Sequence, residues 1–219
     1  MADGRDAARA QILARVRRAA AATGSAEAAP GGAGRVWSAA GTEGADAVAL
    51  FTDRLARHGI GVQHVTDLDD LPRVIASSLW GYGVRRVVVP RDLSSIWLSD
   101  LDGVWAMRDD PPHAPLSARA IESAGAAVTR CALAVADTGT LVLDGGIGQG
   151  RRALSLLPAH HLCVVESGQI VDTMATALAE LDPARPTTWL TGLTSTTAID
   201  GVPVGGVHGP QRLDVVIVG

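Results

Sequence analysis

Two spacings of hydrophobic residues alternate along the chain from about residue 43 onward. A helical spacing with one apolar face is followed by a short continuous apolar run, and this order repeats. The first repeats predict helix 44–59, strand 60–65, helix 68–83 and strand 84–90. Gly59 is the expected cap of the first helix, and Asp67 or Asp69 lies near the start of the second.

The second half of the chain continues the alternation less regularly. We expect a short helix at 92–98, at least one strand within 128–143 that includes 140–143, a strand at 161–167, a helix at 169–181, and strands at 187–192 and 213–219. The strands are short, continuous and rich in β-branched residues, which is typical of strands buried on both faces. The pattern predicts an α/β fold with a mainly parallel sheet and helices on both faces.

The N-terminal region has a different composition. Residues 6–22 are rich in strong helix formers but carry only a narrow apolar stripe, and residues 23–35 are a Gly, Ala, Ser and Pro linker. We therefore expect an N-terminal helix and flexible linker over 1–34 and a single domain over 35–219. The thin stripe favours docking of the helix on a partner protein rather than on its own core.

Charge and length exclude several classes of protein. The 219 residues carry a formal net charge of −4 with acidic and basic side chains mixed, which argues against a nucleic-acid surface. No apolar run has the length of a signal peptide or of a membrane span. A cytoplasmic protein is expected.

The two cysteines do not indicate a redox centre. Cys131 and Cys163 lie in apolar segments without a CxxC spacing, so we interpret both as buried thiols. An iron–sulfur cluster normally takes four ligands, and neither a complete dinucleotide fingerprint nor a haem-attachment motif is present. We expect no cofactor in this chain.

A glycine-rich segment, "GGIGQGRRALSLLP" (145–158), is the strongest candidate for ligand binding. Backbone N–H groups of glycines can surround an anion, and Arg151 and Arg152 can add charge-assisted hydrogen bonds. The segment matches neither a P-loop nor the dinucleotide motif, because arginine stands where each requires another residue. A mobile loop between two apolar segments remains the alternative.

Several motifs in order make the chain resemble the lactate utilization protein C family, also called the LUD domain. These are "ARAQILARVRR", "ADTGTLVLDGG", "GRRALSLLPAHHLCVVESGQIV" and "TTWLTGLTSTTAIDGVPVGGVHGPQRLDVVIVG". They cover roughly residues 7–22 and 126–219. The resemblance implies a fold similar to sugar-phosphate isomerases and CoA transferases. It also implies a part in a bacterial L-lactate oxidation system that works with iron–sulfur proteins.

The resemblance carries over residue by residue. The matching positions are Asp137, Thr138, Gly139 and Thr140, then Gly150, Arg151 and Ser155, then His208, Gly209 and Pro210. One segment departs from the family pattern Ser-x-Thr-x-Asp-Ile-Glu, because Ala198 replaces the first acid and Asp200 shortens the second. If the missing carboxylate serves a ligand, this chain is impaired or differently specific.

The expected ligand site gathers residues near 137–152 and 192–208. Its members are Thr138, Gly139, Thr140, Gly145, Gly146, Gly148, Gly150, Arg151, Arg152, Ser155, Thr194, Ser195, Thr196, His208 and Gly209. The candidate catalytic residues are Asp137, Glu166 and His208, each with a structural alternative. Asp137 could cap a tight turn, Glu166 could be a solvated strand end, and His208 could be a turn residue.

His160 and His161 are adjacent, so in a strand they face opposite sides and cannot share a metal. Taken together, the sequence predicts a non-redox component of iron–sulfur-dependent L-lactate oxidation that binds a small anion. The alternative is a standalone enzyme or binding protein for a phosphorylated or CoA-linked small molecule. Genomic neighbourhood would separate the two.

Overall fold

The computed structural model describes residues 14, 44–193, 195–197, 203–205 and 209–219. The chain divides into two units, residues 1–38 and 39–219, and the fold below is that of the second. The expected N-terminal helix over 6–22 and the expected boundary after residue 34 lie outside the described residues, apart from Ala14. Thr194 and His208 also lie outside them, and only the backbone of Ser195 and Thr196 is described.

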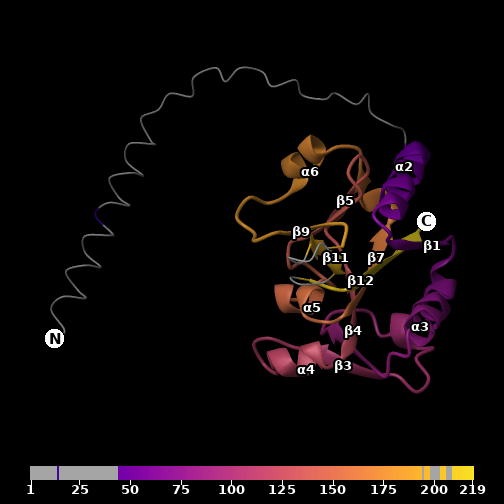
Figure 1. Cartoon of the computed structure of the whole chain (residues 1–219), viewed down its shortest axis with the longest axis vertical. Helices are drawn as coiled ribbons and strands as arrows, with labels where there is room; N and C mark the ends of the chain where they lie inside the picture. The colour runs from indigo at the N-terminus through magenta and orange to yellow at the C-terminus, as the bar shows by residue number, and fades with distance from the viewer. Residues whose placement is uncertain (1–13, 15–43, 194, 198–202, 206–208) are drawn as a thin grey trace. The chain divides into compact units, whose positions relative to one another are not determined.

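A six-stranded parallel sheet forms the centre of the domain (Figure 1). Its strands, in spatial order, are β1 (Gly61–Val65), β12 (Arg212–Val218), β7 (His160–Glu166), β4 (Gly125–Arg130), β2 (Arg86–Pro90) and β3 (Trp105–Asp109). The register places Asp214 beside Leu162 and Val128 beside Leu162 on the other side, so β7 is paired along most of its length on both edges. Its first six residues are buried, as expected for a central parallel strand.

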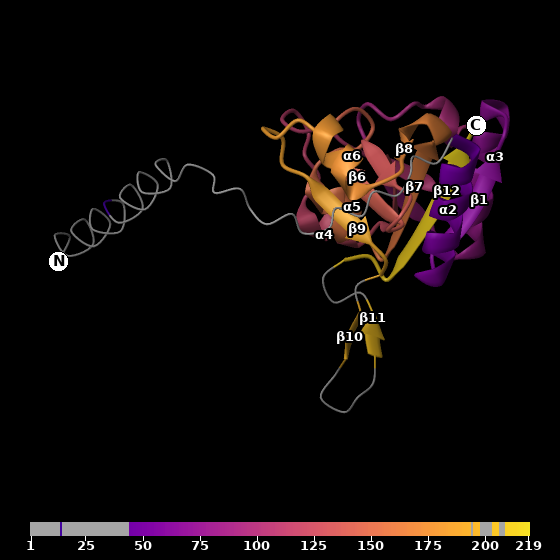
Figure 2. The same ribbon diagram turned by 90° about the horizontal axis from the view of Figure 1, so that it is seen from above.

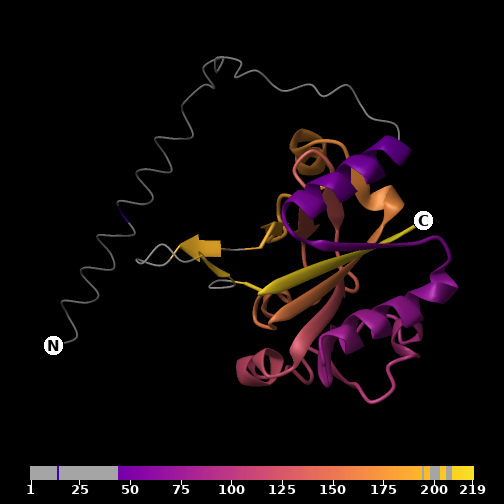
Figure 3. The ribbon, with the colours of Figure 1, turned by 45° about the vertical axis from the view of Figure 1, so that its right-hand side comes forward.

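Helices cover both faces of this sheet. One face packs on α3 (Leu71–Gly81), which the short 3₁₀ helix η1 (Leu68–Asp70) precedes, and on the 3₁₀ helix η2 (Ile96–Leu98); its core includes Ile75, Leu79 and Val164. The other face packs on α2 (Gly44–Arg57), α4 (Ala118–Glu122) and α5 (Arg152–Leu156). Figure 3 shows α2 and α3 on either side of β12. The predicted α/β class is confirmed.

A second, smaller sheet lies on the same side of the large sheet as α2, and both contribute residues to one hydrophobic core cluster. Its order is β8 (Ile170–Val171), β5 (Leu133–Val135), β6 (Thr140–Leu143) and β9 (Thr188–Thr191), with β6 antiparallel to both β5 and β9. Its outer face packs on α6 (Met174–Glu180) through Leu133, Val135 and Ala177 (Figure 2). A hairpin of β10 (Ser195–Thr197) and β11 (Pro203–Gly205) follows β9.

The predicted elements match the structure best where apolar runs are long. Helix 44–59 ends at Arg57 and is followed by Gly59 at φ +71°, and Asp67 caps η1 through the Asp69 N–H. The single helix expected over 169–181 is wrong. Its first half forms η3 (Ser167–Gln169) and β8, because Ile170 and Val171 pair with β5, and only the second half is helical.

In the part of the chain that the structure describes, no helix combines the length and the apolar character that crossing a bilayer requires. Within the same residues, no group of three or more His, Cys, Asp or Glu side chains is arranged to hold a metal ion. Cys131 and Cys163 are buried free thiols, as expected.

Candidate functional site

The glycine-rich segment forms a loop, residues 144–151, between β6 and α5; we call it the glycine loop. It lies at the carboxyl edge of the large sheet, where Gly148 O accepts a hydrogen bond of 2.7 Å from the N–H of Arg130, the last residue of β4. At Gly150, φ is +67° and a Cβ would lie 3.2 Å from Cγ of Pro90, the last residue of β2. The loop therefore occupies the edge at which open α/β sheets bind ligands.

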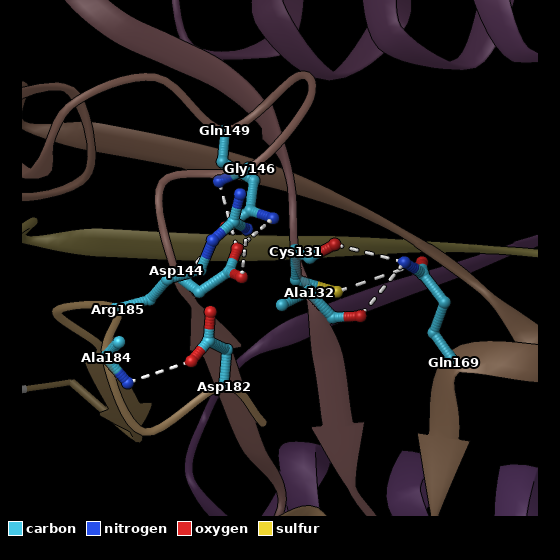
Figure 4. A network of polar contacts seen from close by, with 9 residues as sticks. All are labelled: Cys131, Ala132, Asp144, Gly146, Gln149, Gln169, Asp182, Ala184 and Arg185. Carbon is cyan, nitrogen blue, oxygen red and sulfur yellow. Dashed lines mark hydrogen bonds and ion pairs between the residues drawn. The ribbon is translucent and has the colours of Figure 1, made fainter. Parts of the chain in front are cut away.

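Asp144, the first residue of the glycine loop, hydrogen-bonds to two other residues of the loop. Its Oδ1 accepts hydrogen bonds of 2.9 Å from both the Gly146 N–H and Gln149 Nε2, and Oδ2 is paired with Arg185 Nη1 at 2.6 Å (Figure 4). Burial alone would raise the Asp144 pKa, but hydrogen bonds from Arg185, Gly146 and Gln149 hold it below its ordinary value. The Gly146 N–H expected to face an anion is thus occupied by a carboxylate of the protein.

Arg151 also has a carboxylate partner. Its Nε lies 2.7 Å from Oδ2 of Asp109 and its Nη2 3.0 Å from Oδ1, and Nη2 donates to the carbonyl of Leu116 as well. Asp109 is only 2% exposed and also accepts from the Leu116 N–H at 2.8 Å. This paired geometry raises the Arg151 pKa, mainly through the Asp109 hydrogen bond. Arg151 ties the end of β3 to the start of α5.

Arg152 differs from its neighbour. Its side chain is exposed, and its Nε donates a hydrogen bond of 3.1 Å to Oγ1 of Thr188. Among the residues that the structure describes, no Asp or Glu forms an ion pair with it. Its positive charge is therefore not neutralised by the described fold.

The glycine loop lines an acid-lined pocket of about 630 Å³. Its charged lining residues are Arg130, Asp144, Glu180, Asp182 and Arg185. Arg130 is ion-paired with Glu166, and its guanidinium carbon lies 5.8 Å from the centre of the Trp97 ring. Gln169 hydrogen-bonds the carbonyls of Cys131 and Ala132 along one wall (Figure 4). With both arginines paired, this pocket has little attraction for an anion.

The loop also lines a hollow of about 210 Å³, and a second hollow of about 360 Å³ shares Arg152 and Thr188 with it; together we call the two hollows the Arg152 pocket. The first is lined by Leu143, Gly145, Gln149, Gly150, Arg151, Arg152, Ser155, Pro186, Thr187 and Thr188. The second is lined by Arg152, Leu156, Thr188, Trp189, Leu190, Thr191, Gly192, Gly209, Pro210 and Leu213. None of these described lining residues is Asp or Glu.

The Arg152 pocket brings together part of the site expected from the sequence. Gly145, Gly150, Arg151, Arg152, Ser155 and Gly209 line it, whereas Gly146 lines the acid-lined pocket. Gly148 lies against the Arg130 side chain, where a Cβ would be 2.7 Å from Cδ. Ser155 Oγ donates to the carbonyl of Arg152 at 3.0 Å, so its hydroxyl already has a partner in the helix.

The Asp137–Thr140 segment lies elsewhere, because it forms the turn between β5 and β6, at the far end of β6 from the glycine loop. Gly139 has φ +66°, and a Cβ there would lie 2.8 Å from Cβ of Arg54 on α2. The backbone carbonyl of Asp137 accepts a 3.0 Å hydrogen bond from Arg54 Nε. The turn thus joins α2 to the small sheet.

The hydroxyls of this turn form a short chain. Thr138 and Thr140 Oγ1 atoms are 2.7 Å apart, and Thr140 and Thr191 Oγ1 atoms 2.6 Å apart. Thr191 lines the Arg152 pocket, so this series of hydrogen-bonded hydroxyls connects the turn with the pocket. Oδ1 of Asp137 is buried without a hydrogen-bond partner among the described residues.

Glu166 stands at the exposed end of β7, as expected of a strand end. Besides its ion pair with Arg130, its backbone N–H donates to Gln169 Oε1 at 2.9 Å, and the two residues form a capping box around η3. His208 and Thr194 lie outside the described residues. Of the two candidate catalytic residues that the structure describes, Asp137 and Glu166, it is Glu166 that lies beside the glycine loop, through the contacts of Arg130 with both.

Sequence reasoning did not single out Arg130, Arg185 or Thr188. Arg130 ends an apolar strand, a position typical of sites in parallel sheets, so its place after "AAVT" is a usable signal. Arg185 and Thr188 reach the loop from 41 and 36 residues away in sequence, and their pairing follows from the β6–β9 ladder, which the pattern did not predict.

Comparison with known proteins agrees with this fold. The sequence model of the LUD domain family matches residues 48–218. A lactate utilization protein C from Deinococcus radiodurans is 43% identical over 173 residues, which cover 77% of this chain and 78% of that protein. A protein with the same description from Halalkalibacterium halodurans is 26% identical over 168 residues, covering 70% and 71% of the two chains.

A solved structure is also similar. The crystal structure of a DUF162 family protein from Deinococcus radiodurans matches with a TM-score of 0.65 and 39% identity, covering 81% of this chain and 99% of that one. The match spans nearly all of the solved chain, so the similarity concerns the whole domain and not one motif. On the sequence match over 48–218 and these relatives, the chain belongs to the LUD domain family.

Proposed function

We propose that the protein is a non-redox component of bacterial lactate utilization that binds a small anion in the Arg152 pocket. The observation that carries the binding proposal is the state of Arg152, whose guanidinium lacks a carboxylate partner among the described residues and lines a pocket without described acids. The names of the similar proteins support the pathway.

The chemistry of the pocket suits a carboxylate or a phosphate. A guanidinium offers several N–H donors in one plane, and a hydrogen bond to a charged group contributes about 1.5–3 kcal/mol. Thr187, Thr188 and Thr191 add hydroxyls that can donate to the remaining oxygens of such a ligand. The acid-lined pocket next to it would repel the same ligand.

In this proposal, other proteins accept the electrons that are removed from lactate. Removing two electrons from lactate needs a redox cofactor, and we place that cofactor in iron–sulfur partner proteins in the cytoplasm. This chain would supply ligand binding and docking, and it would need no cofactor of its own.

A reconstitution experiment tests the role. The purified chain, its iron–sulfur partners and an electron acceptor are mixed with L-lactate, and the rate is measured with and without the chain. We expect no acceptor reduction by the chain alone and a clear loss of rate when it is omitted. A chain that carries a visible chromophore and oxidises lactate unaided would overturn the non-redox role.

The same mixture tests the pocket. Arg152→Gln removes the charge while keeping a polar side chain, and Arg185→Gln is the matched control in the acid-lined pocket. We expect Arg152→Gln to lower the reconstituted rate and Arg185→Gln to leave it near that of the wild type. Thermal denaturation of the chain with added ligand tests the alternative, an enzyme or binding protein for phosphorylated or CoA-linked molecules. A melting temperature that is raised by phosphate or CoA but not by L-lactate would favour that alternative.

A further inference from the structure

The large sheet ends in two edge strands, β1 and β3, which differ in what they expose (Figure 1). The exposed residues of β1 are polar, Gln63 and His64. β3 begins instead with Trp105, which is 73% exposed. Edge strands carry backbone groups to which another strand can add, and exposed aromatic residues are common at protein interfaces. The β3 edge is therefore the better candidate for an interaction surface.

The pairing of β2 with β3 shows which backbone groups of β3 face outward. In a parallel pair, alternate residues hydrogen-bond to the neighbouring strand. The Trp105 N–H donates to the Arg85 carbonyl at 2.9 Å, so residues 105, 107 and 109 face β2. Ala106 and Arg108 therefore direct their N–H and C=O groups to the open edge. None of these four groups has a hydrogen-bond partner among the described residues.

The open edge has a defined length. Asp110, the next residue that faces outward, exchanges backbone hydrogen bonds with Ala114: the Asp110 N–H donates at 3.3 Å and the Ala114 N–H at 2.6 Å. The chain thus covers the outer edge just after β3 but not beside it. What stays open is a short stretch in which donors and acceptors alternate.

The charged side chains of β3 do not protect this edge. Natural edge strands are commonly protected by charged side chains, proline or a bulge. Arg108 donates to the carbonyls of Arg91 and Leu93 at 2.8 and 2.9 Å. Asp109 is paired with Arg151. The register with β2 is continuous over the whole strand, so β3 has no bulge. Both charges are used within the fold and leave the edge accessible.

We propose that β3 is a dimerisation edge, at which the β3 strands of two copies of this chain pair antiparallel around a twofold axis. A twofold interface requires a surface that is complementary to itself. The outward groups meet this requirement, since Ala106 of each copy can exchange both of its hydrogen bonds with Arg108 of the other. This register uses all the outward groups and places the axis at Met107. The two six-stranded sheets then join into one continuous sheet.

The side chains of β3 fit the same register. Met107 packs against the cluster of Ile121 beneath α4, and side chains two residues apart share a face, so Trp105 points to the same face. Across the axis, Met107 lies opposite its counterpart in the second copy. Trp105 is its diagonal neighbour there, within the reach of an aromatic ring. Pairing would therefore bury apolar side chains that a single copy leaves exposed or half-buried.

These observations favour a second copy over a strand of another protein. Any strand could satisfy the outward backbone groups, but a second copy also places Met107 and Trp105 opposite apolar side chains. Pairing of two five-residue strands makes a small interface, and interfaces below about 1,200 Å² are typically weak. We expect a dissociation constant in the micromolar range. The proposal does not rest on the function proposed for the Arg152 pocket.

Sedimentation velocity of the full chain tests the proposal. The monomer has a mass of 22.5 kDa, and we expect a shift to twice that mass as the concentration rises through the micromolar range. Ala106→Pro removes an outward N–H that β2 does not use, so the fold should tolerate it. It should weaken self-association about tenfold or more, because proline cannot donate to the added strand.

The other edge of the sheet supplies the matched control. The Val65 carbonyl accepts from the Gly219 N–H at 3.0 Å, so residue 64 faces outward from β1. His64→Pro should therefore leave self-association unchanged. On the side chains, Trp105→Ser should weaken self-association, whereas Leu178→Ser, at an exposed position on α6, should not.

A crosslink tests the register itself. Residue 107 and its counterpart would form a non-hydrogen-bonded pair with Cα atoms about 4.5 Å apart, a spacing that suits a disulfide. With diamide as the oxidant, Met107→Cys should give a covalent dimer that a thiol reductant reverses. Leu178→Cys is the control, and the native Cys131 and Cys163 are buried.

Three results would overturn the proposal. They are a wild-type chain that sediments as a monomer at high micromolar concentration, self-association that is unchanged in both Ala106→Pro and Trp105→Ser, and a Met107→Cys variant that crosslinks no more than Leu178→Cys. The thermal midpoint of each variant is measured alongside, so that loss of self-association is separated from loss of the fold.

Discussion

The acid-lined pocket and the Arg152 pocket contain arginines in opposite electrostatic states. In the acid-lined pocket, Arg130 is paired with Glu166 and Arg185 with Asp144. In the Arg152 pocket, Arg152 contacts a threonine hydroxyl, and the described lining contains no carboxylate. The larger pocket is therefore the weaker candidate for an anion, because its positive charges are already balanced.

The same contrast holds between two adjacent residues. Arg151 has extended backbone, φ −80° and ψ 155°, at the N-cap of α5, whereas Arg152 is the first residue of that helix. The change of backbone direction sends Arg151 toward buried Asp109 and Arg152 toward Thr188. A pair of arginines in the sequence thus divides into one that holds the fold and one that is left for a ligand.

The largest expected effect is that of breaking the Arg151 pair. Arg151→Ala leaves the Asp109 carboxylate, 2% exposed, without its charge partner. Removing one partner of a buried ion pair costs about 3 kcal/mol or more, which lowers the melting temperature by roughly 6–12 °C in a domain of this size. Urea and thermal denaturation measure it.

Arg152→Ala is the matched control, and we expect a change within about 0.5 kcal/mol, as for other exposed substitutions. Equal losses for the two variants would contradict the division of roles.

A smaller loss is expected from Gly150→Ala, which tests whether the loop shape depends on glycine. Gly150 has φ +67°, and a Cβ there would lie 2.9 Å from Cδ2 of Leu154 and 3.2 Å from Cγ of Pro90. A left-handed residue with a side chain costs about 1–3 kcal/mol. Gly168→Ala is the control, since no atom lies within 4 Å of its Cβ position and its φ is not positive. Similar stability of both variants would argue against a tightly held loop.

The acid-lined pocket should respond to pH through Asp144. Because its pKa in the folded protein lies below the ordinary value of 3.8, the ionised carboxylate stabilises the fold at neutral pH. That contribution is lost as the pH falls through the folded pKa. We expect Asp144→Asn to cost about 1 kcal/mol at pH 7, and the cost to shrink below about pH 4.

Stability curves of wild type and Asp144→Asn at several pH values measure this difference. A cost that grows on acidification would mean that Asp144 is not the ionised partner of Arg185. The exposed position of Arg185 predicts a smaller effect for Arg185→Gln than for Asp144→Asn.

Much of the fold could be predicted, because most of its helices and strands show a local spacing of apolar residues that identifies them. The apolar runs at 86–90 and 212–218 are buried central strands, and their periodicity needs no partner to be recognised. In the small sheet, the predicted strands at 140–143 and 187–192 are confirmed as β6 and β9. Their pairing with β5 and β8 could not be predicted, since β8 has two residues and β5 three, and each is a strand only through its neighbours. Short segments carry too little periodicity to decide between helix and strand.

The site could be predicted only where the local sequence identifies it, because its contacts join residues that are distant in sequence. Composition marked the glycine loop and both arginines, but not which arginine has a buried acid opposite it, because Asp109 is 42 residues away in sequence. The Asp137–Thr140 motif was grouped with the loop by proximity along the chain, yet strand β6 separates the two in space. Whether His208 joins the Arg152 pocket stays a prediction, since it lies outside the described residues.

Calorimetric titration of the purified chain tests the central claim most directly. L-lactate and inorganic phosphate are titrated separately into wild type, Arg152→Gln and Arg185→Gln. The account predicts that at least one of the two anions binds, that Arg152→Gln weakens it about tenfold or more, and that Arg185→Gln does not. Unchanged affinity in Arg152→Gln, or no binding of either anion, would contradict it.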